Sequence, residues 1–360
     1  MLRALLDAGL LTCPACRGWV DGVFRNAPLR LAEVHEARAG RPHQGFAACE
    51  ACAARYPLLD GVLVVFKDVG AWLRQQERAV MWRGDLHPDV ARWLRGAWTD
   101  DEDPNWRRQM LAVYARALSP GPADHPLSAL EASGQGFRDA RLDVLIAEGA
   151  LMIDAGCGLG AATLPAAARG GRVLALDSEF GALRMLARLL AEGRTEAPRW
   201  RHGGFDFVEA TLTLPEGVDP ARVALVAADA LDPPLRAGVA DLAVAWNLLD
   251  NVAEPVKLVR QLHAALKPGG VLSLSTPYDW SERATPRAFR LGEAIRTEDS
   301  EDPAAALRTL LTGGMPARAP ELAMTVELDE PALPWVLRRH DRSAHVFLTH
   351  YLEARRPDVG

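Results

Sequence analysis

The sequence contains no apolar run long enough to cross a membrane and no excess of positive charge. A spanning helix needs about 20 consecutive apolar residues, and every apolar stretch here is shorter. The N-terminus has a short apolar patch that Asp7 interrupts and lacks a small-residue cleavage site, so we expect no signal peptide and no membrane partner. The net charge of −6 at pH 7 argues against a long nucleic-acid backbone as the main partner.

Cysteine is scarce, and its placement argues against a disulfide framework. Four of the five cysteines form two CxxC pairs, Cys13-Pro-Ala-Cys16 and Cys49-Glu-Ala-Cys52. This usage is typical of a reducing compartment, so we expect a cytoplasmic protein. The spacing is the one by which paired thiolates reach a single tetrahedral Zn²⁺. Four protein ligands leave no open coordination position, which makes the predicted zinc structural.

The residues after the second cysteine pair complete a first predicted unit, residues 1–68. Tyr56-Pro57 and Asp60-Gly61 precede the strand-like apolar residues 62–66. Two knuckles followed by an apolar strand indicate a small zinc ribbon. The pattern also resembles the ribbon domains related to the methyltransferase-activating subunit of RNA modification systems.

Residues 69–127 form a connecting segment that is rich in tryptophan and arginine. We expect amphipathic helices whose indoles pack on the main domain, although the same residues would also suit a stacking surface for bases. The tryptophans are Trp72, Trp82, Trp93, Trp98 and Trp106.

From residue 128 to 360 the pattern alternates strand and helix, which predicts an α/β domain with a mostly parallel sheet covered on both faces. Strands are expected at 151–155, 172–176, 223–228, 241–246 and 271–276, and helices at 128–148, 161–169, 178–192 and 255–266. An irregular insert is expected at 193–222 and a helix from Pro303. Two further strands are expected at 335–339 and 345–353.

The run LMIDAGCGLG at 151–160 is a strand, a tight turn and the start of a helix. Glycines in such a turn let the backbone approach a nucleotide-like ligand. The spacing also satisfies the loose dinucleotide fingerprint, with Asp177 about 20 residues further on, so an NAD enzyme is an alternative. Asp154 favours a different cofactor, because a carboxylate there can accept hydrogen bonds from a cationic amino group but repels a pyrophosphate.

The ordered set DAGCGLG, LALD, AADALD and LKPGGVL resembles the class I S-adenosylmethionine-dependent methyltransferases, over residues 130–360. That resemblance implies a Rossmann-like sheet of seven strands and S-adenosylmethionine as cofactor. It implies that Gly156, Gly158 and Gly160 approach the methionine part, that Asp177 holds the ribose hydroxyls and that Asp229 reads the adenine. It also places Ala230 and Asn247 at the cofactor.

The acceptor is expected past the ends of the fourth and fifth strands, where ligands bind in such sheets. The sequence there lacks the Asn/Asp-Pro-Pro-aromatic motif typical of DNA and amide methyltransferases, which disfavours base-amino methylation. Our candidate catalytic residues are Asn247, Asp250 and Tyr278. Three aromatic residues are candidates for the pocket wall: Trp246, Trp280 and Phe137. We interpret His202, His340 and His345 as surface or structural histidines.

Several short segments, among them Asp177-Ser-Glu-Phe180 and Leu333-Pro-Trp, resemble the 4-mercaptohistidine N-methyltransferase domains and, more distantly, the carnosine N-methyltransferases. Those enzymes methylate an imidazole nitrogen, so the resemblance implies a small histidine-derived or other heteroaromatic acceptor. One alternative is an RNA or protein methyltransferase whose zinc ribbon presents the macromolecule. A second is a non-catalytic module that binds cofactor and docks a partner.

Overall fold

The computed structural model describes residues 1–20, 23–80, 85–96, 113–115, 118, 125–200, 207–297, 301–340 and 342–358. Trp82, Trp98, Trp106 and His202 lie outside these ranges. No helix among the described residues combines the length and apolarity that a membrane crossing requires.

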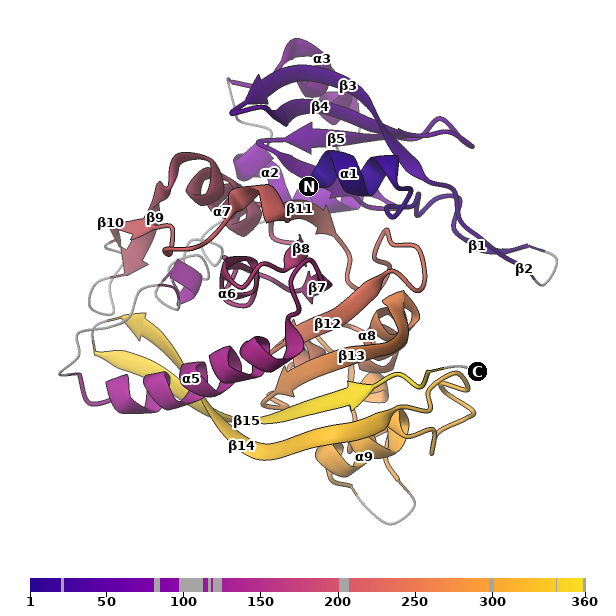
Figure 1. Ribbon diagram of the computed structural model, residues 1–360, viewed down its shortest axis with the longest axis vertical. Helices are drawn as coiled ribbons and strands as arrows, with labels where there is room; N and C mark the ends of the chain where they lie inside the picture. Colours follow the sequence, from indigo (N-terminus) through magenta and orange to yellow (C-terminus); the bar gives the residue numbers. More distant parts are fainter. Residues whose placement is uncertain are drawn as a thin grey trace.

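Five parallel strands form the centre of one large sheet (Figure 1). Each pairs directly with its neighbours, in the order β13-β12-β7-β8-β11. Their bounds are Leu151–Ala155 for β7, Arg172–Asp177 for β8, Val223–Ala228 for β11, Ala240–Trp246 for β12 and Leu266–Thr276 for β13. The strand β13 starts earlier than expected, because Lys267-Pro-Gly-Gly270 lies within it rather than forming a separate turn.

Two apolar cores lie on the two faces of this sheet, because successive strand residues point to opposite sides. Met152 of β7 belongs to one core and Ile153 to the other. The first core is covered by α5 (Ser128–Leu145), α6 (Thr163–Ala168) and α7 (Phe180–Glu192). The second is covered by α1 (Leu2–Asp7), α8 (Pro255–Ala265) and α9 (Pro303–Leu311).

The C-terminal residues add an antiparallel pair to the β13 edge. The two strands, β14 (Thr325–His340) and β15 (Ser343–Arg355), are longer than the sequence pattern predicts. With the five parallel strands they complete the seven strands expected of the class I methyltransferase fold. The order of those seven is β14-β15-β13-β12-β7-β8-β11.

The N-terminal unit extends this sheet at the opposite edge, which corrects the expected seven-stranded, mostly parallel sheet to a mixed sheet of eleven. Residues Val62–Val65 of β6 pair in parallel with Leu225–Ala228 of β11. Three antiparallel strands follow outward: β5 (Arg55–Leu59), β4 (Arg41–Cys49) and β3 (Leu29–Arg38). Without β6, β11 would present a row of unpaired backbone groups, so this pairing satisfies an otherwise open sheet edge.

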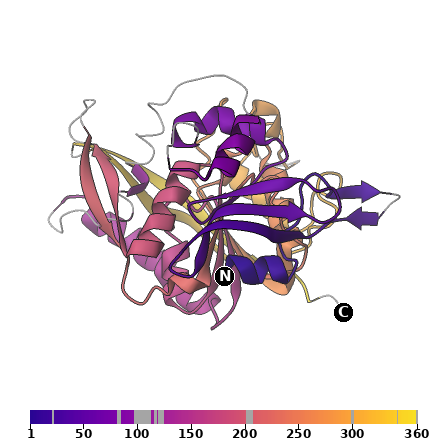
Figure 2. The same cartoon turned by 90° about the horizontal axis from the view of Figure 1, so that it is seen from above.

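The connecting segment contributes two helices to the same face as α7: α2 (Val69–Val80) and α3 (Pro88–Gly96). Trp72 of α2 stacks on Phe66 and donates from Nε1 to the carbonyl of Ser178 at 3.1 Å. Trp93 of α3 packs against Phe46. In Figure 2 these two helices lie on one side of the N-terminal strands and α1 on the other.

Two hairpins project from the main sheet. The insert that we expected to be irregular forms β9 (Arg194–Trp200) and β10 (Phe207–Thr213), which pair in antiparallel register. The strands β1 (Gly18–Val20) and β2 (Val23–Arg25) form the other hairpin, beside the first CxxC pair. Three short 3₁₀ turns complete the described elements: η1 (Pro220–Arg222), η2 (Leu249–Asn251) and η3 (Arg287–Phe289).

Candidate active site

The glycine turn between β7 and α6 adopts the backbone conformation that its sequence predicts. Gly156, Gly158 and Gly160 all have positive φ, at 73°, 53° and 93°. A Cβ on Gly156 would lie 2.9 Å from Cδ1 of Leu248, so this position also needs glycine for close packing. Because Leu248 follows Asn247, the contact joins the glycine turn to the end of β12.

Asp154 ends β7 as a buried carboxylate. It is 3% exposed and accepts a hydrogen bond of 2.6 Å from Oγ1 of Thr163 at the start of α6. Burial raises its pKa to about 7. A carboxylate in this position is strongly stabilised by a nearby cation, because a cation compensates the charge that burial disfavours.

Asp177 ends the neighbouring strand, β8, and fixes the glycine turn. Its two carboxylate oxygens accept hydrogen bonds of 2.8 Å from the backbone N–H groups of Gly158 and Glu179. Burial raises the pKa of Asp177 as well. Each oxygen keeps a second lone pair, so the carboxylate can still accept from a hydroxyl of a ligand.

Asp229 and Ala230 follow β11, the next strand outward. Oδ1 of Asp229 accepts from the backbone N–H of Leu231 at 2.8 Å, and the side chain is exposed. The loop that begins here is held by the N-terminal unit. The backbone N–H of Thr12 donates to Pro234 at 2.7 Å, and Arg17 forms an ion pair with Asp232.

The donor and acceptor set at the ends of β7, β8 and β11 fits S-adenosylmethionine. Asp154 offers a buried counter-charge for its amino group, Asp177 offers acceptors for ribose hydroxyls, and Asp229 offers one for an adenine amino group. The glycine turn follows β7 directly and contacts the end of β8, where the Gly158 N–H donates to Asp177.

The end of β12 carries Asn247 in a constrained conformation. Its φ is +57°, an uncommon value for a residue with a side chain. Its backbone N–H donates to the carbonyl of Ser275 at 2.6 Å, and Oδ1 accepts from the Ser275 hydroxyl at 2.7 Å. These two bonds to β13 fix the amide at the carboxyl edge of the sheet, where strained residues often serve a ligand.

Asp250 and Tyr278 occupy different environments, although we predicted a catalytic role for both. Asp250 is 1% exposed and its Oδ2 accepts from the backbone N–H of Asp279 at 2.8 Å, which ties the loop after β13 to η2. Tyr278, with a φ of +56°, has its hydroxyl 2.7 Å from Nδ1 of His350. Burial raises the pKa of both side chains.

His350 and Asp329 were not predicted from the sequence. Nε2 of His350 lies 2.8 Å from Oδ1 of Asp329, so Tyr278, His350 and Asp329 form a continuous hydrogen-bonded chain across β13, β15 and β14. Although partial burial acts to raise it, contacts with His350 and Arg308 hold the pKa of Asp329 below its usual value. An ionised Asp329 accepts, so Nε2 carries the hydrogen and Nδ1 accepts from Tyr278.

The three aromatic candidates for the pocket wall have separate partners. The Trp280 ring lies 6.1 Å from that of Tyr278. Nε1 of Trp246 donates to the hydroxyl of Ser273 at 2.9 Å, and Phe137 of α5 packs edge-on against Tyr351.

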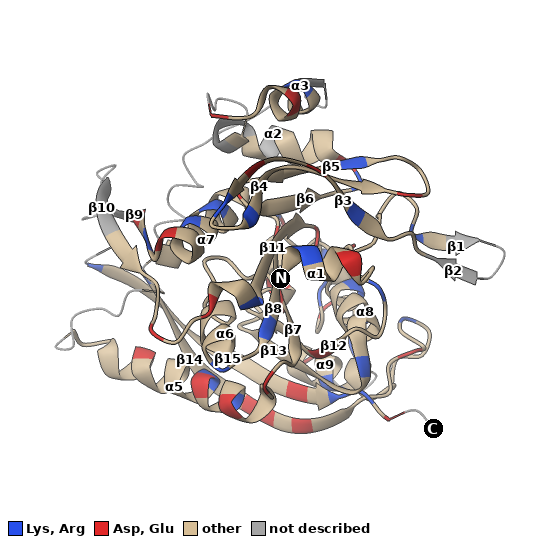
Figure 3. Cartoon of the chain, turned by 45° about the horizontal axis from the view of Figure 1, so that its top comes forward, with Lys and Arg blue, Asp and Glu red and all other residues tan. Residues whose placement is uncertain are grey.

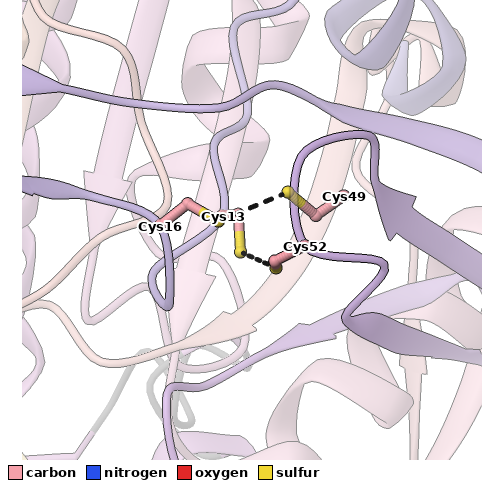
Figure 4. A group of neighbouring side chains, drawn as sticks. All are labelled: Cys13, Cys16, Cys49 and Cys52. Carbon is pink, nitrogen blue, oxygen red and sulfur yellow. Dashed lines mark hydrogen bonds between the residues drawn. The ribbon is translucent and has the colours of Figure 1, made fainter.

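The four paired cysteines form one cluster beside the β11 loop (Figure 4). Their sulfur atoms all lie within 4.8 Å of one another. The Sγ–Sγ distances are 3.8 Å for Cys13 and Cys52 and 3.7 Å for Cys16 and Cys49. These are far longer than a disulfide bond of about 2.05 Å and equal the roughly 3.8 Å between sulfurs around a tetrahedral zinc with 2.3 Å bonds.

Residues 153–274, from β7 to β13, match the family model of a methyltransferase domain. Among similar solved structures is an S-adenosylmethionine-dependent methyltransferase from Methanosarcina mazei, with 18% identity and a TM-score of 0.38, covering 60% of this chain and 97% of that one. Another is magnesium protoporphyrin IX methyltransferase from Synechocystis with bound cofactor, with 15% identity and a TM-score of 0.41, covering 72% and 100%.

A third is the complex of the Trm112 methyltransferase activator with a methyltransferase from Haloferax volcanii, with 16% identity and a TM-score of 0.38, covering 68% and 97%. No curated protein matches the sequence significantly. The family match spans the glycine turn and the carboxylates of Asp154, Asp177 and Asp229. It supports an S-adenosylmethionine-dependent methyltransferase.

Proposed function

We propose that this methyltransferase transfers the methyl group to a nitrogen of a small histidine-derived or related heteroaromatic acceptor. The observation that carries the proposal is the chain Tyr278–His350–Asp329, with contacts of 2.7 and 2.8 Å, at the end of β13. An imidazole alkylated at one nitrogen becomes a cation and must release a proton from the other. The hydrogen-bonded side chains of Tyr278, His350 and Asp329 supply an acceptor for that proton.

The proton moves in a balanced relay. When bound, S-adenosylmethionine supplies a methyl group that already carries its leaving group, so a new nitrogen–carbon bond forms as the sulfur–carbon bond breaks. Tyr278 then takes the acceptor's N–H proton on Oη and gives its own hydroxyl proton to Nδ1 of His350. The ionised carboxylate of Asp329 stabilises the resulting imidazolium of His350.

Asn247 and Asp250 have positioning roles in this scheme. The two bonds from Ser275 hold the Asn247 amide at the junction between the cofactor residues and the acceptor residues. Asp250 holds the loop that carries Tyr278, through the backbone N–H of Asp279. A neutral imidazole, with a reference pKa of about 6.5, is largely unprotonated at pH 7, so orientation and exclusion of water account for most of the required catalysis.

A methyl-transfer screen tests the acceptor class. We expect labelled methyl to appear on histidine, its thiol derivatives or histidine dipeptides, with a mass increase of one methyl group and the label on a ring nitrogen. Total RNA serves as the competing acceptor. Label confined to RNA would reject the proposal, as would label on a carbon or oxygen atom of the small acceptors.

The position of the cysteine cluster disfavours presentation of a macromolecule by the N-terminal unit. That unit joins the sheet at β11, whereas Asn247 and Tyr278 follow β12 and β13, with β7 and β8 in between. Basic and acidic residues are interspersed along the described elements (Figure 3).

The second alternative, a non-catalytic module, predicts cofactor binding without turnover of any acceptor.

We also infer that the four cysteines bind one structural Zn²⁺. Their donor set and sulfur spacing support this, and the backbone N–H of Ala51 lies 3.4 Å from the sulfur of Cys49, as is common around metal-bound thiolates. The ion would hold the two CxxC turns together at the start of the chain. Its predicted stoichiometry is one zinc per chain.

A further inference from the structure

Three arginines lie between α5 and the C-terminal strands, and two of them have carboxylate partners. Arg141 of α5 binds Glu353 through two bonds of 2.9 and 2.7 Å. Arg338 of β14 binds Glu131 of α5. The third, Arg138, lies one turn from Arg141, and among the described residues it makes no ion pair with a carboxylate.

Arg138 is nevertheless buried. It is 6% exposed, and burial lowers its pKa to about 10, which leaves it cationic at neutral pH. Its Nη2 donates to the hydroxyls of Ser275 at 3.3 Å and Thr349 at 3.4 Å, both long bonds. Its Nε is buried and has no hydrogen-bond partner among the residues that the structure describes.

An unpaired buried cation costs free energy, because neither water nor a counter-charge replaces its hydration. The packing enforces that burial. A Cβ on Gly134 would overlap the carbonyl oxygen of Pro334, so glycine here lets α5 approach β14 closely. One turn later, this approach places Arg138 against β13 and β15. Most buried donors in folded proteins have a partner, so the free Nε of Arg138 is available to an acceptor that a ligand supplies.

The surroundings of Arg138 connect it to the acceptor side of the active site. Ser275, which accepts from Arg138, donates its own hydroxyl to Asn247 at 2.7 Å. The Arg138 guanidinium also lies 5.7 Å from the centre of the Trp246 ring. The hydroxyl of Ser275 therefore links Arg138 to Asn247, the residue that we place between the cofactor and the acceptor.

We propose that Arg138 binds the carboxylate of the methyl acceptor, through the unpaired Nε and an adjacent Nη. This inference rests on the proposed function, because a histidine-derived acceptor carries such a carboxylate. The guanidinium fork matches a carboxylate in two parallel bonds, which a lysine cannot reproduce. The acceptor's carboxylate then supplies the counter-charge that Arg138 lacks.

The test compares the binding of L-histidine and histamine, which differ by the carboxylate, to the full chain saturated with S-adenosylhomocysteine. Calorimetry should give about 10- to 100-fold tighter binding of histidine by the wild type, the range typical of a charge-assisted hydrogen-bonded pair. R138Q should reduce this ratio to about one, and R138K should restore it in part. The matched control R141Q, in the same helix, should melt at a lower temperature but keep the wild-type ratio. An R138Q variant with the wild-type ratio would overturn the proposal.

Two further measurements distinguish a wrong role for Arg138 from a wrong acceptor class. If the wild type binds neither histidine nor histamine, the acceptor class is wrong, and acetate alone then tests Arg138. Acetate should raise the melting temperature of the wild type but not that of R138Q; equal protection of both would reject a carboxylate site. R138M should melt at or above the wild-type temperature, because it removes an uncompensated buried charge, whereas a purely structural arginine would make it melt lower.

Discussion

At the residue scale, the buried Asp154 and the partly buried Asp177 are the two carboxylates that we propose for the cofactor site. Asp154 and Asp177 both have a raised pKa because burial disfavours their ionised forms, and they lie on either side of the glycine turn. A protein tolerates such charges where a ligand compensates them. The amino group of the cofactor is a suitable partner for Asp154.

This arrangement predicts a pH-dependent affinity for S-adenosylhomocysteine. The pKa of Asp154 is raised to about 7, so the carboxylate becomes protonated below pH 7 and loses its attraction for the ligand's ammonium group. We expect affinity to fall as the pH drops from 8 to 6, approaching about tenfold per pH unit below 7. Calorimetry at several pH values measures this. D154N should bind weakly and show a much shallower slope, with Asp177 as the remaining carboxylate of raised pKa.

The same group has the opposite effect on the ligand-free protein. Because the folded-state pKa exceeds the ordinary aspartate pKa of 3.8, ionisation disfavours the folded state as the pH rises from 4 through 7. The melting temperature of D154N should therefore fall less than that of the wild type over this range. Identical pH profiles for the two proteins would show that Asp154 is not perturbed.

The relay through Tyr278 predicts a loss of turnover without a loss of cofactor binding. In Y278F the hydroxyl that contacts His350 is gone, so the acceptor's proton has no protein acceptor. We expect kcat to fall by about 100-fold, the lower end of the range for general acid–base catalysis. Steady-state kinetics with the best acceptor measures this, and calorimetry with S-adenosylhomocysteine serves as the binding control. W280F, which alters the neighbouring ring, should stay within severalfold of the wild type.

At the scale of elements, the ion pair that attaches α5 to β15, Arg141–Glu353, should respond asymmetrically to substitution. Glu353 is 1% exposed and Arg141 is 26% exposed. Removing the arginine leaves a buried carboxylate unpaired, whereas removing the carboxylate charge leaves an arginine that can reach water. R141M should therefore be destabilised by about 3 kcal/mol, and E353Q by clearly less. Urea denaturation of both variants checks the order, and the reverse order would contradict it.

The sequence pattern predicted the bounds of the central strands well, but it did not predict which strands pair with one another at the edge of the sheet. The strands at 151–155 and 223–228 were predicted with their observed bounds, because the first runs directly into the glycine turn and the second is a short apolar run followed by Asp229. The docking of β6 on β11 was not predicted, since a run such as Val-Leu-Val-Val specifies burial but not which strand it joins. Asp154 was identifiable because it lies two residues before the glycine motif, and Asp177 because it ends the next strand, about 20 residues further on. Arg138 and His350 were not, because their significance depends on neighbours more than 70 residues away in the chain.

At the scale of the whole molecule, the cysteine cluster and the cofactor site belong to one continuous structure. The first CxxC turn is followed by Arg17, which binds Asp232 in the same loop as Asp229. If the four cysteines bind zinc as we propose, its removal by a chelator, or C13S, should lower the melting temperature and weaken cofactor binding severalfold. Metal analysis should find about one zinc in the wild type and in the control C157S, and much less in C13S. Metal-free wild-type protein with full cofactor affinity would contradict this coupling.

The parallel pairing of β6 with β11 also affects how the chain folds as it is synthesised. About 160 residues separate the two strands, so β6 leaves the ribosome with the edge that will pair with β11 still open. At synthesis rates of about 5–20 residues per second, roughly 8–30 s pass before β11 is synthesised and can pair with that edge. During this interval the N-terminal strands are exposed to pairing with other nascent chains. Slower translation between the codons for residues 66 and 223 should therefore lower the yield of soluble protein.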